Sequence, residues 1–366
     1  MNNNRYGGHG FDVNNDAFGN IAATLYMLLE AVRGVYRRQS DLCATACGPL
    51  WGKRVIDMGC GFGTTTVAIA QHNPKEVLAV DNSDLLTDIF QTLLMKKCDE
   101  RNLDNLLTSL HTEKTVGGGG TKRLLQLLRK MCDEFANSTF RQKGGTVNLI
   151  RGSCIELSIG GFDAIVGNNF VHWPINKLRK QLEDRGMDSE SAHHDAIISV
   201  LRSLGAMLEP GGRIALLEPK NFVVIDNDHK LDAMITKRSS VLTHPVYMEM
   251  DRLANELLAR DYSIIREPAK PVPLFKTSEV HRLFTKAGFH SIQIHINESY
   301  EGTLSVQEVI ETVFASIPMH LAGVNLPMKE KIKIAKRLRH IAKQTISSID
   351  FNQPMQEVAF VFTAVH

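Results

Sequence analysis

Residues 55–66 read VIDMGCGFGTTT. An apolar run leads directly into a turn with three glycines, and a threonine-rich segment follows the turn. Glycines allow the backbone to approach a ligand closely, and the N–H groups at the start of a helix attract anions. We therefore predict a buried strand, a ligand-binding turn and a helix over these residues.

Apolar runs of the same kind recur along the chain, separated by segments with helical periodicity. They cover residues 77–80, 147–150, 164–166 and 214–217, and two later runs cover 292–296 and 358–365. Near-continuous apolar runs separated by helices are typical of a parallel sheet that helices cover on both faces. The sequence of 366 residues therefore predicts an α/β fold.

Two classes of ligand use a glycine-rich turn of this kind: a dinucleotide, held by its pyrophosphate, and S-adenosylmethionine. The dinucleotide pattern is Gly-x-Gly-x-x-Gly/Ala, but here Gly63 comes one residue early and Thr64 stands at the third position. The carboxylate of Asp57 would repel a pyrophosphate and attract the ammonium group of S-adenosylmethionine. The side chains therefore favour the cationic ligand.

A second carboxylate, Asp81, ends the apolar run 77–80. At this place it can accept hydrogen bonds from both hydroxyls of an adenosine ribose. The alternative is that Asp81 caps the next helix, a role equally open to Asn82, Ser83 or Asp84. Because the glycine-rich turn lies upstream, we favour the ribose role.

Three features resemble class I S-adenosylmethionine-dependent methyltransferases: residues 57–63, Asp81, and the segment 208–213, which reads LEPGGR. The resemblance implies a Rossmann-like, seven-stranded and mostly parallel sheet with helices on both faces, inserted helical lids, and residues 358–365 as an antiparallel strand. It also implies S-adenosyl-L-methionine as the cofactor. The cofactor-binding residues that we predict are Asp57, Gly59, Cys60, Gly61, Gly63, Asp81, Asn82, Ser153, Cys154 and Asn168.

The predicted adenine contact departs from the family. Members carry an acidic residue after the third strand, but residues 151–154 read RGSC here. Ser153, or the backbone N–H of Cys154, would have to take its place.

Residues 167–174 follow the fourth predicted strand and read GNNFVHWP. Family members that act on bases or amide nitrogens often carry Asn/Asp-Pro-Pro-aromatic at this point, and this sequence lacks it. The segment is more similar to the Asn-x-x-His-Trp stretch of small-molecule O- and C-methyltransferases, including those that esterify carboxylic acids and those attached to polyketide assembly lines. A small-molecule acceptor is therefore implied, with Asn169 and Trp173 in its pocket, although an ordinary core position is the commoner explanation for Trp173.

Methyl transfer from a sulfonium is an in-line displacement, so proximity, alignment and exclusion of water supply most of the rate. A carboxylate acceptor needs no base, whereas a phenol, hydroxyl or carbon acid does. His172 is the candidate base because imidazole titrates near neutral pH, and a structural histidine at a helix start is the alternative. Glu218, at the end of the fifth strand, is a second catalytic candidate.

Inserted segments interrupt the predicted core. Gly117–Gly120 suggest a flexible joint. Apolar residues between positions 21 and 35 recur at helical spacing and predict an amphipathic helix that ends at Arg37 and Arg38. The predicted units are 1–50, an N-terminal helical segment; 51–225, the cofactor-binding core with an insertion at about 102–143; 226–272, an insertion or lid; 273–300, core; 301–350, a lid with two helices; and 351–366, the terminal strand.

Composition narrows the setting and the partners. A net charge of +2 gives no global argument for nucleic acid, and six scattered cysteines fit reduced thiols in a cytoplasmic protein without bound metal. The basic segment 329–343 could face nucleic acid, an anionic membrane surface or an acidic carrier protein, but a solvated helix face is the commoner explanation. We expect no membrane span, and the sequence is compatible with a homo-oligomer.

Three hypotheses follow. The first is a small-molecule methyltransferase, the second is an RNA- or protein-modifying methyltransferase, and the third is a non-catalytic S-adenosylmethionine-binding partner. The missing Asn-Pro-Pro-aromatic stretch disfavours the second, and the intact turn with Asp57 and Asp81 disfavours the third.

Overall fold

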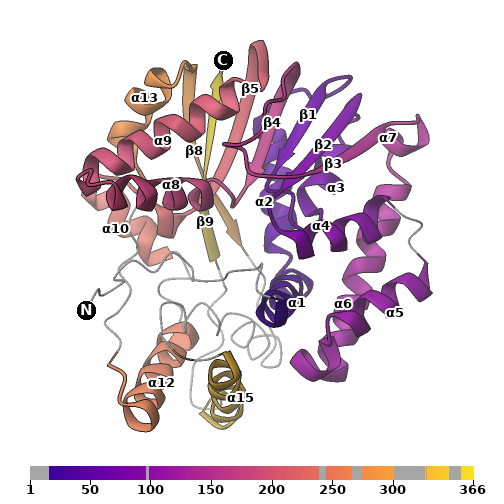
Figure 1. Ribbon diagram of the computed structural model, residues 1–366, viewed down its shortest axis with the longest axis vertical. Helices are drawn as coiled ribbons and strands as arrows, with labels where there is room; N and C mark the ends of the chain where they lie inside the picture. The colour runs from indigo at the N-terminus through magenta and orange to yellow at the C-terminus, as the bar shows by residue number, and fades with distance from the viewer. Residues whose placement is uncertain are drawn as a thin grey trace.

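A central seven-stranded sheet organises the computed structural model, which describes residues 16–95, 99–238, 245–265, 274–300, 326, 328–345 and 356–366 (Figure 1). The strands of this sheet are β1 (Arg54–Met58), β2 (Glu76–Asp81), β3 (Thr146–Arg151), β4 (Phe162–Asn168), β5 (Leu208–Pro219), β8 (His290–Tyr300) and β9 (Gln356–Val365). Each strand predicted from an apolar run is present.

The strand order is β3-β2-β1-β4-β5-β9-β8. Neighbouring strands from β3 to β5 pair in parallel, whereas β9 runs antiparallel to both β5 and β8. The predicted fold class is therefore confirmed, including the antiparallel terminal strand. The order reverses at β1, whose neighbours are β2 and β4, and ligands of open α/β sheets bind at such a reversal, beyond the carboxyl ends of the strands.

Helices cover both faces of the sheet (Figure 1). They are α1 (Asp16–Arg33), α2 (Val35–Ala46), α3 (Thr64–Ala70), α4 (Asp84–Phe90), η1 (Gln91–Met95), α5 (Glu100–Ser109), α6 (Thr112–Ala136), α7 (Thr139–Gln142), α8 (His172–Asp184), α9 (Ser189–Gly205), η2 (Lys220–Phe222), α10 (His229–Arg238), α12 (Pro245–Tyr262), α13 (Thr277–Lys286) and α15 (Met328–Thr345). A small second sheet pairs β6 (Val223–Val224) with β7 (Phe275–Lys276).

Alternate residues of the strands feed two separate cores. Val55 and Val166 pack with α1, α2, α3 and α6, whereas Ile56 and Ile165 pack with α8, α9 and α13. Successive side chains of a strand point to opposite faces, so a sheet buried on both faces needs apolar residues at every position. This requirement explains the continuous apolar runs in the sequence.

The N-terminal helical segment differs from its prediction. Instead of one helix ending at Arg37 and Arg38, the chain breaks at Gly34, whose φ of 61° and ψ of 28° are left-handed. Gly34 has no side chain to cap α2, and Glu30 accepts hydrogen bonds from the N–H groups of Tyr36 at 2.7 Å and Arg37 at 3.1 Å instead. The single-helix prediction is therefore wrong, because a glycine and a buried carboxylate start a second helix.

The insertion predicted at about 102–143 is helical. Within α6, Gly117 alone departs from helical angles, with φ 77° and ψ 172°, and Gly118–Gly120 are helical. The glycine tract thus contains a kink at Gly117 between two helical stretches, and its flexibility stays a prediction. Packing of α6 against α1 overrides the low helix propensity of glycine.

The cysteines also differ in part from expectation. Cys43, Cys47, Cys60 and Cys154 are buried free thiols, and the thiol of Cys43 donates to the carbonyl oxygen of Ala215 at 3.1 Å. Cys132 is disulfide-bonded, which corrects the expectation that all six cysteines are reduced, and Cys98 lies outside the described residues.

Helices α12 and α15 lie together in the regions predicted as lids (Figure 1). Tyr262 Oη donates to Glu330 at 2.6 Å, and Arg337 pairs with Asp261 at 2.5 Å. The helix predicted over residues 306–314 lies outside the described residues, so the lid role of these segments stays a prediction. Among the described helices, none combines the length and the apolar character that crossing a bilayer requires.

Candidate functional site

A cavity of about 470 Å³ opens where the carboxyl ends of β1, β2 and β4 meet helices α1, α2 and α8. Its walls include Tyr26, Arg33, Tyr36, Gln39, Gly59, Cys60, Gly61, Asp81, Asn82, Ser83, Ser153, Cys154, Asn168, Asn169, His172, Trp173 and Phe222. The volume falls within the range of small-molecule sites. The position is the one that the sheet topology favours for a ligand.

The glycine-rich turn after β1 is fixed by its own backbone N–H groups. Gly59 and Cys60 both donate to the carbonyl oxygen of Val80, at 2.8 and 3.0 Å, and Gly63 donates to Cys60 at 2.9 Å. The N–H of Gly61 donates to Asp81 at 2.9 Å. These donors are therefore used within the protein, and the turn does not offer them to an anionic ligand.

Gly59 also explains why this turn needs glycine. Its φ is +75°, and a Cβ at this position would lie 2.3 Å from Cβ of Phe170, in the loop after β4. Gly63 has a φ of +104° and packs against Leu94 instead, so it shapes the turn without lining the cavity. The two glycines thus serve packing, whereas Gly61 has open space around its Cα.

Asp81 is partly buried at the edge of the cavity. One carboxylate oxygen accepts from Gly61, and the other accepts from the N–H of Ser83 at 2.9 Å. Burial raises the pKa of Asp81, and the backbone hydrogen bonds lower it. Ser83, not Asp81, caps α4, since its hydroxyl accepts from Leu86 N–H at 3.2 Å. The capping alternative for Asp81 is therefore excluded, and each of its oxygens retains further acceptor capacity.

Asp57 lies deeper than predicted. It is fully buried and accepts from Thr66 Oγ1 at 2.5 Å, but it does not line the cavity. Burial and the neighbouring Asp81 carboxylate raise the pKa of Asp57 and the Thr66 hydrogen bond lowers it, which leaves the pKa at about 7. Among the described atoms, Asp57 Oδ1 has no hydrogen-bond partner. Asp57 therefore lies behind the wall of the cavity and not in it.

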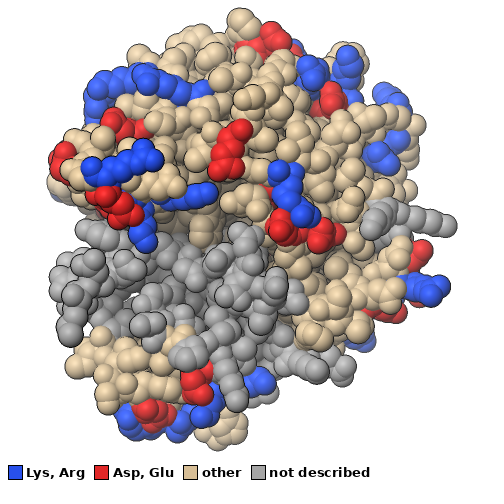
Figure 2. Space-filling model, viewed as in Figure 1, with Lys and Arg blue, Asp and Glu red and all other residues tan. Residues whose placement is uncertain are grey.

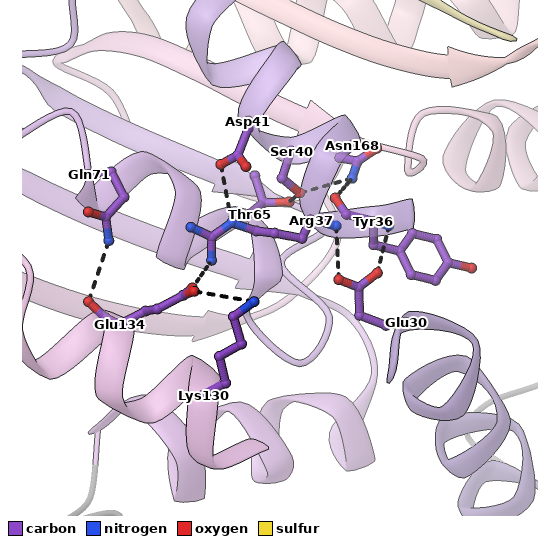
Figure 3. A network of polar contacts seen from close by, with 10 residues as sticks. All are labelled: Glu30, Tyr36, Arg37, Ser40, Asp41, Thr65, Gln71, Lys130, Glu134 and Asn168. Carbon is purple, nitrogen blue, oxygen red and sulfur yellow. Dashed lines mark hydrogen bonds and ion pairs between the residues drawn. The ribbon is translucent and has the colours of Figure 1, made fainter. Parts of the chain in front are cut away.

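The end of β4 is joined to α2 by a buried polar network (Figure 3). Asn168 Nδ2 donates to the Tyr36 carbonyl oxygen at 3.1 Å and to Ser40 Oγ at 3.0 Å, and Ser40 pairs with Thr65 Oγ1 at 2.8 Å. A carbonyl oxygen can only accept, so the amide orientation of Asn168 is determined. Its Oδ1 is buried in the cavity wall and has no partner among the described atoms.

Asn169 is held by α2 as well. It adopts a left-handed backbone with φ 55°, and its Nδ2 donates to Gln39 Oε1 at 2.7 Å. Both Asn169 and Gln39 line the cavity.

His172 opens α8, and buried groups fix its ring. Nδ1 lies 2.8 Å from Oε2 of Glu218, which is fully buried at the end of β5. The ring stacks on Phe222, with centroids 4.3 Å apart at 15°, and its centroid lies 5.1 Å from that of Trp173. His172, Trp173 and Phe222 line the cavity, whereas Glu218 lies behind His172.

Most predicted site residues therefore meet in one cavity. Those that line it are Gly59, Cys60, Gly61, Asp81, Asn82, Ser153, Cys154, Asn168, Asn169, His172 and Trp173. Asp57, Gly63 and Glu218 support the walls from behind. The sequence interpretation did not identify Tyr26, Arg33, Tyr36 and Gln39 of α1 and α2, nor Phe222 of η2. The one available signal was the polar side chains on the otherwise apolar N-terminal helices.

The charged surface gives no strong field on the face shown in Figure 2. Lys and Arg are interspersed there with Asp and Glu over the described surface. The basic segment 329–343 belongs to α15, where Ile334 and Leu338 are buried and Lys336 and Arg337 are exposed. This is the pattern of a solvated helix face opposite an apolar stripe.

No family model matches the chain, and no curated protein matches it. Among solved structures, it is similar to the cyclopropane synthase MmaA2 from Mycobacterium tuberculosis, with a TM-score of 0.42, 12% identity and coverage of 89% of this chain and 83% of that one. The YcgJ protein from Bacillus subtilis has a TM-score of 0.39 and 13% identity, covering 90% and 97%.

A third similar structure is the phosphoethanolamine N-methyltransferase 2 of Haemonchus contortus in complex with S-adenosyl-L-methionine. Its TM-score is 0.35 at 13% identity, and the match covers 90% of this chain and 52% of that one. Similarity at this level does not extend to activity or ligand.

Proposed function

We propose that this chain is an S-adenosylmethionine-dependent methyltransferase that acts on a small molecule. One observation carries the proposal: four backbone N–H groups of the glycine-rich turn are bonded within the protein, and the carboxylate of Asp81 lines the cavity beside them. The N–H groups of Gly59, Cys60, Gly61 and Gly63 are used within the protein. Asn168, whose Oδ1 has no partner among the described atoms, also lines the cavity, and Asp57 is buried behind the turn.

This pattern of charge suits a cation-bearing nucleoside and opposes a dinucleotide. A pyrophosphate needs N–H donors and no adjacent carboxylate, whereas an ammonium group needs acceptors. An acceptor oxygen left unpaired in a buried site costs about 1–3 kcal/mol, so a ligand donor for Asn168 Oδ1 would recover that free energy.

Each wall residue then has a role toward the cofactor. Asp81 would accept the ribose hydroxyls with its remaining acceptor sites, and Asn168 would accept from the ammonium group. Ser153 and Cys154 would border the adenine. When bound, the cofactor supplies an activated methyl group. The chain itself aligns the acceptor and excludes water from the reaction.

The walls of the cavity support a small-molecule acceptor. Helices α1 and α2 close it from one side, and Tyr26, Trp173 and Phe222 give it aromatic walls. Trp173 is 37% exposed, so it borders the opening rather than the core. His172 is the only imidazole among the described lining residues and is the candidate general base.

Two alternatives stay weaker. An RNA- or protein-modifying methyltransferase would use the basic face of α15, but that face is partly paired with acidic groups, such as Asp261 with Arg337. A non-catalytic binding partner would not need the buried support behind His172. A cytoplasmic location, an acidic carrier protein and a homo-oligomer remain predictions from the sequence.

The test is calorimetric titration of the wild type and of Asp81→Ala with S-adenosylmethionine, S-adenosylhomocysteine and NAD(H). We expect the first two to bind the wild type, and Asp81→Ala to weaken them at least tenfold because two ribose hydrogen bonds are lost. Glu76→Gln, on the same strand, is the control and should bind as the wild type does. Preference for NAD(H), or no binding of either sulfur compound, would refute the proposal.

A further inference from the structure

We infer that Glu218 is a positioning residue that makes Nε2 of His172 a general base, and that the acceptor therefore carries a proton that must leave, as a hydroxyl or phenol does. The inference rests on the proposed function, and it narrows the substrate class within it. A carboxylate acceptor would need no such base.

The two oxygens of Glu218 have different partners. Oε1 accepts from the N–H groups of Val171 at 2.9 Å and His172 at 3.4 Å, at the start of α8. Oε2 lies 2.8 Å from His172 Nδ1. Oε1 faces donors only, so the position of this oxygen is fixed by the helix start.

This arrangement determines the tautomer of His172. A carboxylate is an acceptor, so Nδ1 carries the hydrogen and the lone pair resides on Nε2. The ring cannot turn easily, because it stacks on Phe222 at 4.3 Å and is 6% exposed as a residue. Glu218 does not line the cavity, whereas His172 does, so the carboxylate acts through the imidazole.

The chemical step balances without another reactant. The acceptor O–H bond breaks and its proton passes to Nε2 of His172, the oxygen electron pair forms the bond to the methyl carbon, and the pair of the broken carbon–sulfur bond stays on sulfur. The imidazolium that results is stabilised by the buried carboxylate of Glu218. A serine or cysteine nucleophile is not required.

The substitution Glu218→Gln tests this geometry directly. The amide oxygen must take the place of Oε1, because it faces two N–H donors, and the amide NH₂ must then face Nδ1. An NH₂ donor would move the lone pair to Nδ1 and the hydrogen to Nε2. The variant thus keeps size and shape but inverts the tautomer of His172. Glu209→Gln, an exposed change on the same strand, is the matched control.

The decisive measurement is nitrogen-15 NMR of the histidine side chains in the complex with S-adenosylhomocysteine, with His172 assigned by the His172→Asn variant. In the wild type and in Glu209→Gln we expect the hydrogen on Nδ1 and none on Nε2. In Glu218→Gln we expect the hydrogen on Nε2 and none on Nδ1. A hydrogen on Nε2 in the wild type would overturn the inference, even if the variant failed to fold.

Activity supplies the second readout. The acceptors are 2-naphthol, 2-naphthoic acid and 2-naphthylamine, which share one aromatic frame and differ in the accepting group. We expect methylation of the naphthol, with kcat lower by about 10²–10⁴ in Glu218→Gln. Affinity for S-adenosylhomocysteine should be unchanged in that variant.

The outcomes separate the two claims. Absence of cofactor binding in the wild type would refute the proposed function. Cofactor binding combined with methylation of the acid or the amine, at a rate that His172→Asn leaves unchanged, would refute only the role of the His172–Glu218 pair. If none of the three acceptors reacts, the nitrogen-15 spectra still test the inference, because a hydrogen on Nε2 of His172 in the wild type would refute it.

Discussion

The turn after β1 and the loop between β4 and α8 line one cavity, but different interactions hold them. Backbone N–H groups fix the turn, with Val80 and Asp81 as acceptors. Buried side chains fix the loop, namely Asn168 through Ser40 and His172 through Glu218. The first region depends on residues close in sequence, and the second on contacts between α2, β4, α8 and β5.

This difference separates two tasks. A turn held mainly by its backbone N–H groups keeps its shape when most surrounding side chains change, which suits a site for a constant ligand. A loop held by side chains can change its specificity when one side chain changes. We therefore expect substitutions in the turn to affect folding and cofactor binding together, and substitutions around the loop to affect acceptor chemistry first.

The largest effect is expected where the two regions touch. Gly59→Ala would place Cβ at 2.3 Å from Phe170, at a φ of +75° that alanine avoids. We expect loss of about 3 kcal/mol or more in the free energy of unfolding, together with loss of cofactor binding. Urea denaturation and calorimetry measure both.

Gly61→Ala is the matched control for this prediction. Gly61 has φ +53° and open space around its Cα, so only backbone strain remains, about 1 kcal/mol. If the two substitutions destabilised the protein equally, close packing of Gly59 against Phe170 would not be the reason for glycine at position 59.

A smaller effect is expected from the link between α2 and β4. Ser40→Ala removes an acceptor for Asn168 and leaves Thr65 without this hydroxyl, in a fully buried site. We expect about 1–3 kcal/mol lower stability in thermal or urea unfolding, with cofactor affinity reduced less than in Gly59→Ala.

Ser109→Ala is the comparison for Ser40→Ala. Ser109 is exposed and donates to Leu106 at 2.8 Å, so its removal should change stability by less than about 0.5 kcal/mol. If Ser40→Ala were equally neutral, the network would not hold α2 to the sheet.

The last expected effect depends on pH and concerns the joint between α1 and α2. Burial raises the pKa of Glu30 from 4.5 to about 7, so the folded state binds a proton that the unfolded state has released. The stability from this group is complete below pH 4.5 and is lost as pH rises through about 7. Glu30→Gln mimics the protonated group.

We therefore expect the wild type to lose about 2 kcal/mol more stability than Glu30→Gln between pH 5 and 8. Asp57 titrates in the same pH range, with a pKa of about 7. Because both proteins contain Asp57, its contribution cancels in the difference between their free energies of unfolding. Parallel pH profiles would show that Glu30 is not held as a buried carboxylate.

The sequence predicts the first region much better than the second. Gly59, Gly61 and Asp81 can be predicted from the sequence. The two glycines belong to one strand-turn-helix unit and Asp81 ends the next strand, and both units have recognisable local sequence patterns. Asp57 lies behind the turn instead of in the cavity wall and accepts a hydrogen bond from Thr66, and its role toward a cofactor stays a prediction.

The second region needs contacts that no local pattern contains. Gln39 meets Asn169, and Phe222 stacks on His172, across long separations in sequence. The break at Gly34 also escaped prediction, because the helical periodicity continues through it while Glu30 provides the new helix start. His172 and Glu218 were individually predicted, but their pairing required the fold.

The antiparallel strand β9 has a consequence for how the molecule is made. It lies between β5 and β8, so the edge of β5 stays unpaired until residues 356–365 have emerged from the ribosome. An unpaired strand edge is a template for association with other chains. Strand β9 thus closes the sheet late in synthesis, and until then the edge of β5 is open to association with other chains.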